Sequence, residues 1–270
     1  MDTPEELRNT LSLESNLSRI GITSLTFPQI FEKSRIFGLK ANRAFIPEQR
    51  GRVADALLLM LEVHFDQNPR PDGTPYTDHP LTVADKIMDI MVNPDPELVI
   101  AALLHDSVED QSNKLARKYR GYNADSTLTD EQAALEFIKV HYGARVGRTV
   151  AALSNPDFNA QLAILGINEN HPDYRIHKNI LYAQHVAEIS ENPDAFLIKL
   201  MDFTSNAGDL MKLPDGSQKI KLMRKYGPVV GTMKDGLSRL NLPIKEKAKI
   251  LLEAKLEDID NYISQQISAK

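Results

Sequence analysis

Four side chains that can bind metal or transfer protons lie close together in one short stretch: His105, Asp106, Glu109 and Asp110. They follow an apolar run that starts at Leu98. Burial of a hydrophobic core does not require one imidazole and three carboxylates at the end of such a run. Three acids beside a histidine repel one another unless a cation lies among them. We therefore predict that the segment Leu98–Asp110 holds part of a metal-dependent active site.

The spacing within this segment allows metal binding and proton transfer to be carried out by two different pairs of side chains. On a helix, residues four apart share a face, which pairs His105 with Glu109 and Asp106 with Asp110. One pair can hold a metal while the other residues position water and transfer protons. The alternative is a helix C-terminus with solvated acids. Carboxylates are disfavoured at that end of the helix dipole, which argues against the alternative.

His79 is a second candidate, at the start of the preceding predicted helix. Pro80 suits a first helical position, so His79 is expected at or next to the N-cap. A single histidine at such a position is more often structural than a ligand. Antiparallel packing of this helix on the next one would bring His79 towards His105.

Asp202 is a stronger candidate, because it lies in an otherwise apolar stretch between Phe196 and Phe203. An ionised carboxylate in such a helix is unfavourable unless it is paired or bound to metal. Asn206 follows one turn later on the same face. The alternative is a salt bridge to Lys199, which we expect to be less favourable because both groups would then need partial burial.

Two histidines and two aspartates form a mixed nitrogen and oxygen ligand set. Such a set suits Mn²⁺, Fe²⁺ or Zn²⁺ and is richer in nitrogen than a typical Mg²⁺ or Ca²⁺ site. A metal held in this way lowers the pKa of bound water and makes hydroxide available near neutral pH.

Three ordered segments resemble the HD superfamily of metal-dependent phosphohydrolases. More specifically, they resemble the hydrolase domain of the RelA/SpoT family and the stand-alone small alarmone hydrolases. The resemblance extends roughly from Pro47 to Leu213 and is carried by Arg70-Pro-Asp-Gly-Thr-Pro-Tyr-Thr-Asp-His79-Pro, Ala101–Asp110 and Ile198–Asn206.

The resemblance implies a function and a set of site residues. The family removes the 3′-pyrophosphate of guanosine tetra- or pentaphosphate with Mn²⁺, so that ppGpp gives GDP and pyrophosphate. The implied metal ligands are His79, His105, Asp106 and Asp202. Glu109 and Asp110 stand where the family's acidic pair polarises or positions the attacking water. Arg70 and Asn206 match positions that contact the base and sugar of the nucleotide.

The chain also departs from the family pattern around the substrate. Pro71 replaces a basic residue, Leu153-Ser-Asn-Pro replaces a Val-Thr-Lys run, and Phe203 follows Asp202 where an arginine is common. These changes leave the metal ligands in place. Two alternatives therefore stay open: an HD-type phosphohydrolase acting on another nucleotide or phosphoester, and a non-catalytic metal-binding sensor module.

Residues 111–124 are polar and basic and are expected to form a loop or insertion. The segment either meets substrate phosphates or is a solvated surface turn. Its basic residues are Lys114, Arg117, Lys118 and Arg120.

The fold is predicted to be all-α, a single compact helical HD-domain fold of about ten helices, because strand-like alternation is missing. Residues 1–45 are expected to form an N-terminal arm or short helices. Residues 46–270 are expected to form the hydrolase domain, with its core at 47–213 and C-terminal helices after it. The helix that starts near Pro96 is apolar nearly all round and should be buried.

The composition narrows the classes of partner. The 270 residues carry a net charge of −5 and no cysteine, which excludes disulfides and thiolate ligands and argues against broad nucleic-acid binding. No apolar segment approaches the roughly 20 residues that span a bilayer. The polar, acidic start resembles neither a secretory signal nor a transit peptide. We expect a cytoplasmic protein with a small-molecule nucleotide substrate.

Overall fold

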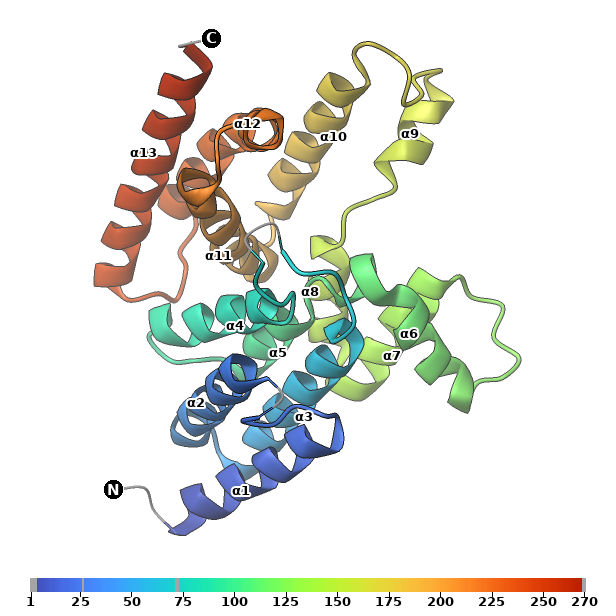
Figure 1. The fold of residues 1–270 in the computed structure, drawn as a ribbon, viewed down its shortest axis with the longest axis vertical. Helices are drawn as coiled ribbons and strands as arrows, with labels where there is room; N and C mark the ends of the chain where they lie inside the picture. Colours follow the sequence, from blue (N-terminus) through green and yellow to red (C-terminus); the bar gives the residue numbers. More distant parts are fainter. Residues whose placement is uncertain (1–3, 26, 71–72, 269–270) are drawn as a thin grey trace. The chain divides into compact units, whose positions relative to one another are not determined.

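The computed structural model describes residues 4–25, 27–70 and 73–268. In these residues the regular elements are thirteen α-helices and one short 3₁₀-helix, with no strand among them (Figure 1). The all-α prediction is confirmed. There are more helices than the predicted ten or so, partly because residues before 45 form two full helices and the polar segment after Asp110 is helical.

The chain divides into two compact units, residues 1–151 and 152–270. This division differs from the predicted boundary at residue 45, between an N-terminal arm and the hydrolase domain, which stays a prediction. The first unit contains α1 (Pro4–Arg19), α2 (Pro28–Ala44), α3 (Pro47–His64), α4 (Asp78–Ile90), α5 (Pro96–Leu104), α6 (Ser107–Tyr122) and α7 (Asp130–Tyr142), and α8 (Ala144–Leu153) runs across the division.

Helix α5 forms the centre of the first unit, with α3 and α4 packed against it (Figure 1). All seven residues from Leu98 to Leu104 are buried, as predicted for a helix that is apolar on every side. The Asp95 carboxylate starts the helix by accepting from the backbone N–H groups of Glu97 and Leu98, and Pro96 follows it in the first turn. Arg145 of α8 also pairs with Asp95 at 2.6 Å.

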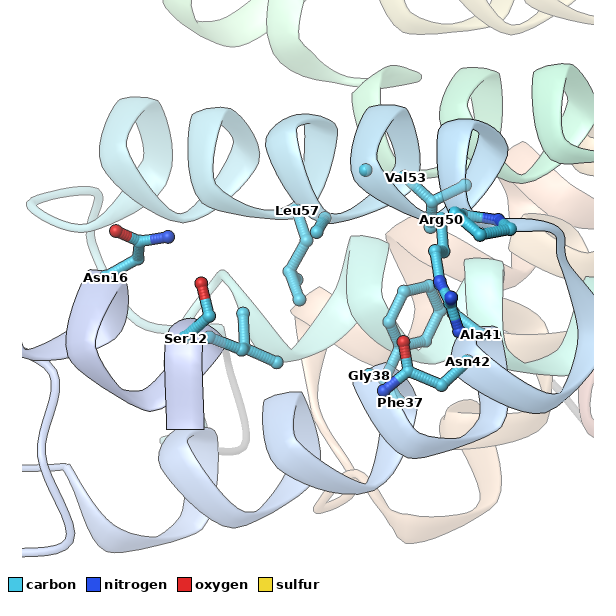
Figure 2. Close-up of a pocket in the computed structure, with 13 residues that line it drawn as sticks. Ser12, Asn16, Phe37, Gly38, Ala41, Asn42, Arg50, Val53 and Leu57 are labelled. Atoms are coloured by element: carbon cyan, nitrogen blue, oxygen red, sulfur yellow. The ribbon is translucent and has the colours of Figure 1, made fainter. Parts of the chain in front are cut away.

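Helices α1 and α2 pack on each other and on α3, so the predicted arm contributes to the core of this unit. Leu17 and Phe37 are buried there. Gly38 of α2 lets α1 approach closely, because a Cβ at this position would lie 2.5 Å from Cδ2 of Leu13. A cavity of about 300 Å³ lies among the three helices (Figure 2), lined by residues that include Ser12, Asn16, Asn42, Arg50 and Leu57.

The second unit contains the remaining helices. They are α9 (Phe158–Ile164), α10 (Tyr174–Ile189), α11 (Pro193–Gly208), the 3₁₀-helix η1 (Asp209–Lys212), α12 (Ser217–Arg239) and α13 (Glu246–Ser268). Helix α11 contacts α10, α12 and α13. Asn192 caps α11 by accepting from the N–H groups of Asp194 and Ala195. Among the described residues, no helix is long and apolar enough to cross a membrane.

Candidate metal centre

The chain breaks its helix between His105 and Asp106. Helix α5 ends at Leu104 and α6 begins at Ser107, with Asp106 as the residue before the helix. The prediction of one helix that ends in a cluster of acids is therefore wrong. Glu109 and Asp110 lie in the first turn of α6, where negative charge is favoured by the helix dipole. The dipole thus gives no argument against solvated acids.

Three of the four predicted metal ligands lie together in the first unit. His79, His105 and Asp106 each offer one ligand atom, and these atoms lie within 4.8 Å of one another. His79 Nε2 is 3.6 Å from Oδ2 of Asp106, and His105 Nε2 is 3.2 Å from Oδ1 of the same carboxylate. The two imidazoles are 5% and 3% exposed. A group with two buried nitrogen donors and one half-buried oxygen donor can hold a divalent transition metal.

The orientation of His105 suits a ligand. Its Nδ1 is 2.8 Å from the carbonyl oxygen of Ala102. A carbonyl only accepts, so Nδ1 carries the proton in the neutral ring and Nε2 keeps its lone pair. Nε2 is the atom that faces Asp106.

His79 lies slightly deeper in its helix than predicted. Helix α4 starts at Asp78 after Thr77, so His79 is in the first turn and Pro80 is not the first helical residue. A proline early in the first turn is tolerated because the N–H group that it lacks has no partner within the helix.

Tyr76 contacts this cluster, although the sequence analysis assigns it no role. Its hydroxyl donates to Oδ2 of Asp106 at 2.7 Å. Burial, followed by the negative charges of Asp106 and Asp110, raises the pKa of Tyr76 well above its usual value. The hydroxyl therefore stays protonated and remains a donor. Its position three residues before His79, just before α4, is the signal that sequence reasoning could have used.

The acidic pair is solvent-exposed at the start of α6. Asp110 accepts a hydrogen bond at Oδ2 from Nε2 of Gln67, at 2.9 Å. Gln67 lies in the turn after α3, and sequence reasoning missed it because it is distant in the chain from the motif it contacts. The catalytic roles of Glu109 and Asp110 stay predictions.

Arg70 occupies a tight turn before α4. Its backbone N–H donates to the carbonyl of Thr74, and its carbonyl accepts from Gly73, which has a φ of +84°. Pro71, the predicted departure from the family pattern, lies outside the described residues. A substrate-binding role for Arg70 stays a prediction.

Asp202, the fourth predicted ligand, lies on α11 of the second unit, where it is 6% exposed. Its Oδ2 is 3.1 Å from Nζ of Lys199, so the salt bridge that the sequence analysis disfavoured is present. The Lys199 ammonium also lies 5.6 Å from the ring centre of Tyr182, which helps to offset its burial. Asn206 donates to Oδ1 of Asp202, as expected for residues one turn apart. Metal binding by Asp202 and substrate binding by Asn206 stay predictions.

The basic segment after Asp110 is a helix and not a loop, because Leu115 and Ala116 give it a buried face. Its basic side chains reach acids of the first unit: Lys114 pairs with Asp66, Lys118 with Glu62 at 2.7 Å, and Arg120 with Asp130 at 2.7 Å. These pairs hold α6 against neighbouring segments.

Comparisons with known proteins agree with the resemblance seen in the motifs. No family model matches the chain. The mouse protein guanosine-3′,5′-bis(diphosphate) 3′-pyrophosphohydrolase MESH1 (Mus musculus) is 26% identical over 185 residues, which are 68% of this chain and 83% of that protein. The human MESH1 protein (Homo sapiens) is 27% identical over 186 residues, with the same two coverages.

A bacterial relative is much longer than this chain. Guanosine-3′,5′-bis(diphosphate) 3′-pyrophosphohydrolase of Aquifex aeolicus (strain VF5) is 25% identical over 223 residues, which are 81% of this chain and 27% of that protein.

One solved structure has a similar fold. It is described as a metazoan ortholog of SpoT that hydrolyzes ppGpp and plays a role in starvation responses. It superposes with a TM-score of 0.51 at 21% identity, over 78% of this chain and 94% of that one. The chain thus has the all-helical fold of the metazoan SpoT ortholog, and the resemblance to HD-type ppGpp hydrolases is confirmed by relatives that are named guanosine-3′,5′-bis(diphosphate) 3′-pyrophosphohydrolases.

Proposed function

We propose that this protein is a metal-dependent hydrolase that removes the 3′-pyrophosphate of guanosine tetra- or pentaphosphate. The observation that carries the proposal is the group formed by the buried His79 and His105 and the half-buried Asp106. It supports the proposal because it coincides with similarity to proteins named for this reaction. In the hydrolysis of ppGpp, one water molecule supplies OH to the departing pyrophosphate and a proton to the 3′ oxygen of GDP.

The metal we propose is Mn²⁺, with Fe²⁺ and Zn²⁺ as alternatives that the same donors accept. His79, His105 and Asp106 would hold it, and the sequence motif supports Asp202 as a fourth ligand. A divalent ion supplies Lewis acidity that lowers the pKa of a water molecule. The fixed Nδ1–H tautomer of His105 and the hydrogen bond from Tyr76 to Asp106 support a ligand role for both residues.

The acidic pair is proposed to handle the attacking water. Asp110 and Glu109 follow the metal group directly in the chain and lie within one helical turn of Asp106. Each carboxylate is an acceptor that can orient the water and take its proton. Arg70 and Asn206 are proposed to bind the base and sugar of the nucleotide.

The test is pyrophosphate release from guanosine tetraphosphate by purified protein with Mn²⁺, followed with and without a chelator. We expect turnover that needs the metal and is lost in the Glu109→Gln/Asp110→Asn double variant. That variant should bind the same amount of metal. If the wild-type protein binds metal but releases no pyrophosphate, the substrate assignment is wrong.

A second candidate keeps the chemistry and changes the nucleotide. The observation in its favour is Phe203, which is 1% exposed and packs edge-on against Tyr226 with ring centres 5.8 Å apart. A buried phenyl ring cannot supply the charged contact that an arginine gives at this position in the family. A panel of nucleotides under the same conditions separates the two candidates by the substrate with the highest kcat/KM.

A further inference from the structure

A chain of hydrogen bonds leads from the buried side of α6 to the exposed carboxylate of Asp110. Ser107 Oγ is 3.2 Å from Nε2 of His64, and Nδ1 of His64 is 2.6 Å from Oε1 of Gln67. Nε2 of Gln67 then lies 2.9 Å from Oδ2 of Asp110. Both ends of this chain are on the first turn of α6, and its middle comes from the end of α3 and the turn after it.

Asp110, the last residue of this hydrogen-bond chain, sets the direction of every hydrogen bond in it. An ionised carboxylate only accepts, so the amide nitrogen of Gln67 must face Asp110 and its oxygen must face His64. That oxygen only accepts, so His64 carries its proton on Nδ1. The bare Nε2 then accepts from the hydroxyl of Ser107. All three bonds therefore donate towards Asp110.

The environment of His64 favours the neutral ring that this order requires. His64 is 1% exposed, and its burial lowers its pKa below the usual value. The ring also stacks on Tyr76, with centres 5.1 Å apart. A neutral histidine with one bare nitrogen can be an acceptor on one side and a donor on the other, which a charged ring cannot.

Gln111, the residue after Asp110, also holds Gln67 in place. Nε2 of Gln111 donates to Oε1 of Gln67 at 3.0 Å, so this oxygen accepts two hydrogen bonds. Gln111 has a non-helical backbone, with φ −134° and ψ 25°, directly after Asp110. The Gln67 amide is thus fixed by His64 and Gln111, and its remaining function is to donate to Asp110.

We propose that Gln67 is a positioning residue, which holds the Asp110 carboxylate in the rotamer that meets the attacking water, and that His64 fixes the amide orientation of Gln67. The inference rests on the proposed hydrolase function. A carboxylate on an exposed helix turn samples several rotamers, and a donor on one oxygen selects the orientation of the other. A purely structural role would instead predict loss of stability with unchanged kcat.

The first test is kinetic. Gln67→Leu should lower kcat for guanosine tetraphosphate by about 10- to 100-fold, the size of effect that loss of an orienting hydrogen-bond partner has in metal sites. KM and metal content should stay within about twofold, because the variant touches neither the proposed ligands nor Arg70. Gln265→Leu, the same change at an exposed position near the end of α13, is the matched control and should leave kcat unchanged.

A double-mutant cycle shows whether Gln67 acts through Asp110. In an Asp110→Asn background, measured by single turnover with enzyme in excess, Gln67→Leu should change the rate by less than about twofold. An independent effect of the two substitutions would overturn the inference. An inactive wild-type protein would contradict the proposed function, whereas an active wild type with an equally active Gln67→Leu variant would contradict only the positioning role.

The second measurement does not depend on activity. NMR of ring-labelled histidine should show His64 of the folded protein as the neutral Nδ1–H tautomer, which differs from the Nε2–H form that free histidine prefers. Gln67→Leu should shift His64 away from the Nδ1–H form, because Nδ1 loses its acceptor. A charged His64, or the Nε2–H tautomer in the wild type, would overturn the inference even if a variant fails to fold.

Discussion

The hydroxyl of Tyr76 donates to Oδ2 of Asp106, the same oxygen that lies 3.6 Å from Nε2 of His79. The tyrosine therefore orients a carboxylate that is a proposed metal ligand. We predict that Tyr76→Phe weakens Mn²⁺ binding by about 10- to 100-fold, since loss of such a partner has this effect in metal sites. Isothermal titration calorimetry measures the change. Tyr122→Phe, at a side chain that is 75% exposed, is the control, and equal affinities in both variants would contradict the role of Tyr76.

The buried ion pair on α11 predicts an asymmetric effect on stability. Asp202→Ala leaves the Lys199 ammonium buried without its carboxylate, which costs about 3–5 kcal/mol in free energy of unfolding. The Lys199→Met/Asp202→Leu double variant should recover most of this loss, because both charges are removed. Denaturant unfolding of the metal-free proteins measures both values. If the double variant is as unstable as Asp202→Ala, the destabilisation does not come from the unpaired lysine.

The metal role of Asp202 needs a substitution that keeps the shape of the side chain. Asp202→Asn retains an acceptor for Lys199 but has no negative charge to offer a metal ion. We predict that this variant is folded and binds Mn²⁺ at least about tenfold more weakly than the wild type. Elemental analysis after dialysis, with circular dichroism as the folding control, measures this. Undiminished metal content would exclude Asp202 as a ligand.

His64 predicts a dependence of stability on pH. Burial lowers the pKa of His64 in the folded protein below 6.5, the ordinary value for a histidine side chain. As the pH falls below about 6.5, the unfolded chain takes up a proton that the folded protein does not, so the folded state loses stability. The stability that comes from keeping His64 neutral is fully present above about pH 6.5. It is lost as the pH falls from the pKa of His64 in the unfolded chain to its lower pKa in the folded protein.

The measurement compares the wild type with His64→Gln. The difference in unfolding free energy between the two proteins should shrink as the pH is lowered from about 7 to about 5. Acids that do not interact with His64 contribute equally to both proteins and cancel in the difference, whereas Asp106 and Asp110 interact with it. A difference that stays constant with pH would show that His64 does not titrate in this way.

Lys118 tests whether α6 binds substrate or only neighbouring helices. Its ammonium pairs with Glu62 at 2.7 Å, and the two side chains are 33% and 50% exposed. Lys118→Ala should lower stability by no more than about 1 kcal/mol, as is usual for exposed pairs. KM for the nucleotide should stay within about twofold. A large rise in KM would instead support contact with substrate phosphates, one of the two alternatives that the sequence leaves open for this segment.

The grouping of His79, His105 and Asp106 could be predicted from the sequence, but the backbone that carries them could not. His105 and Asp106 were found from their residue types and spacing, because a metal site depends on which donors are present. The break in the helix between them is not predicted, because the apolar residues before it and the polar residues after it both follow a helical period. Only the packing of α5 decides where that helix ends.

Sequence reasoning did not find the residues that contact the candidate site from other segments of the chain. Gln67 has no predicted role, because its contact to Asp110 is made in space and leaves no local pattern. Tyr76 has none either, although it lies only three residues before His79. The Lys199–Asp202 pair was misjudged for a related reason. The ring of Tyr182, which lies near the lysine and makes its burial acceptable, comes from another helix.

The full burial of α5 has a consequence for how the metal reaches its site. This helix is among the most protected parts of the first unit, so its amide protons should exchange with solvent only when the unit unfolds as a whole. His105, directly after α5, is therefore in place before any ion arrives. A chelator should remove the metal without unfolding the protein, unlike in a zinc finger, where the ion drives folding. Activity should then return on adding metal at the rate of ion binding, with no slower refolding phase.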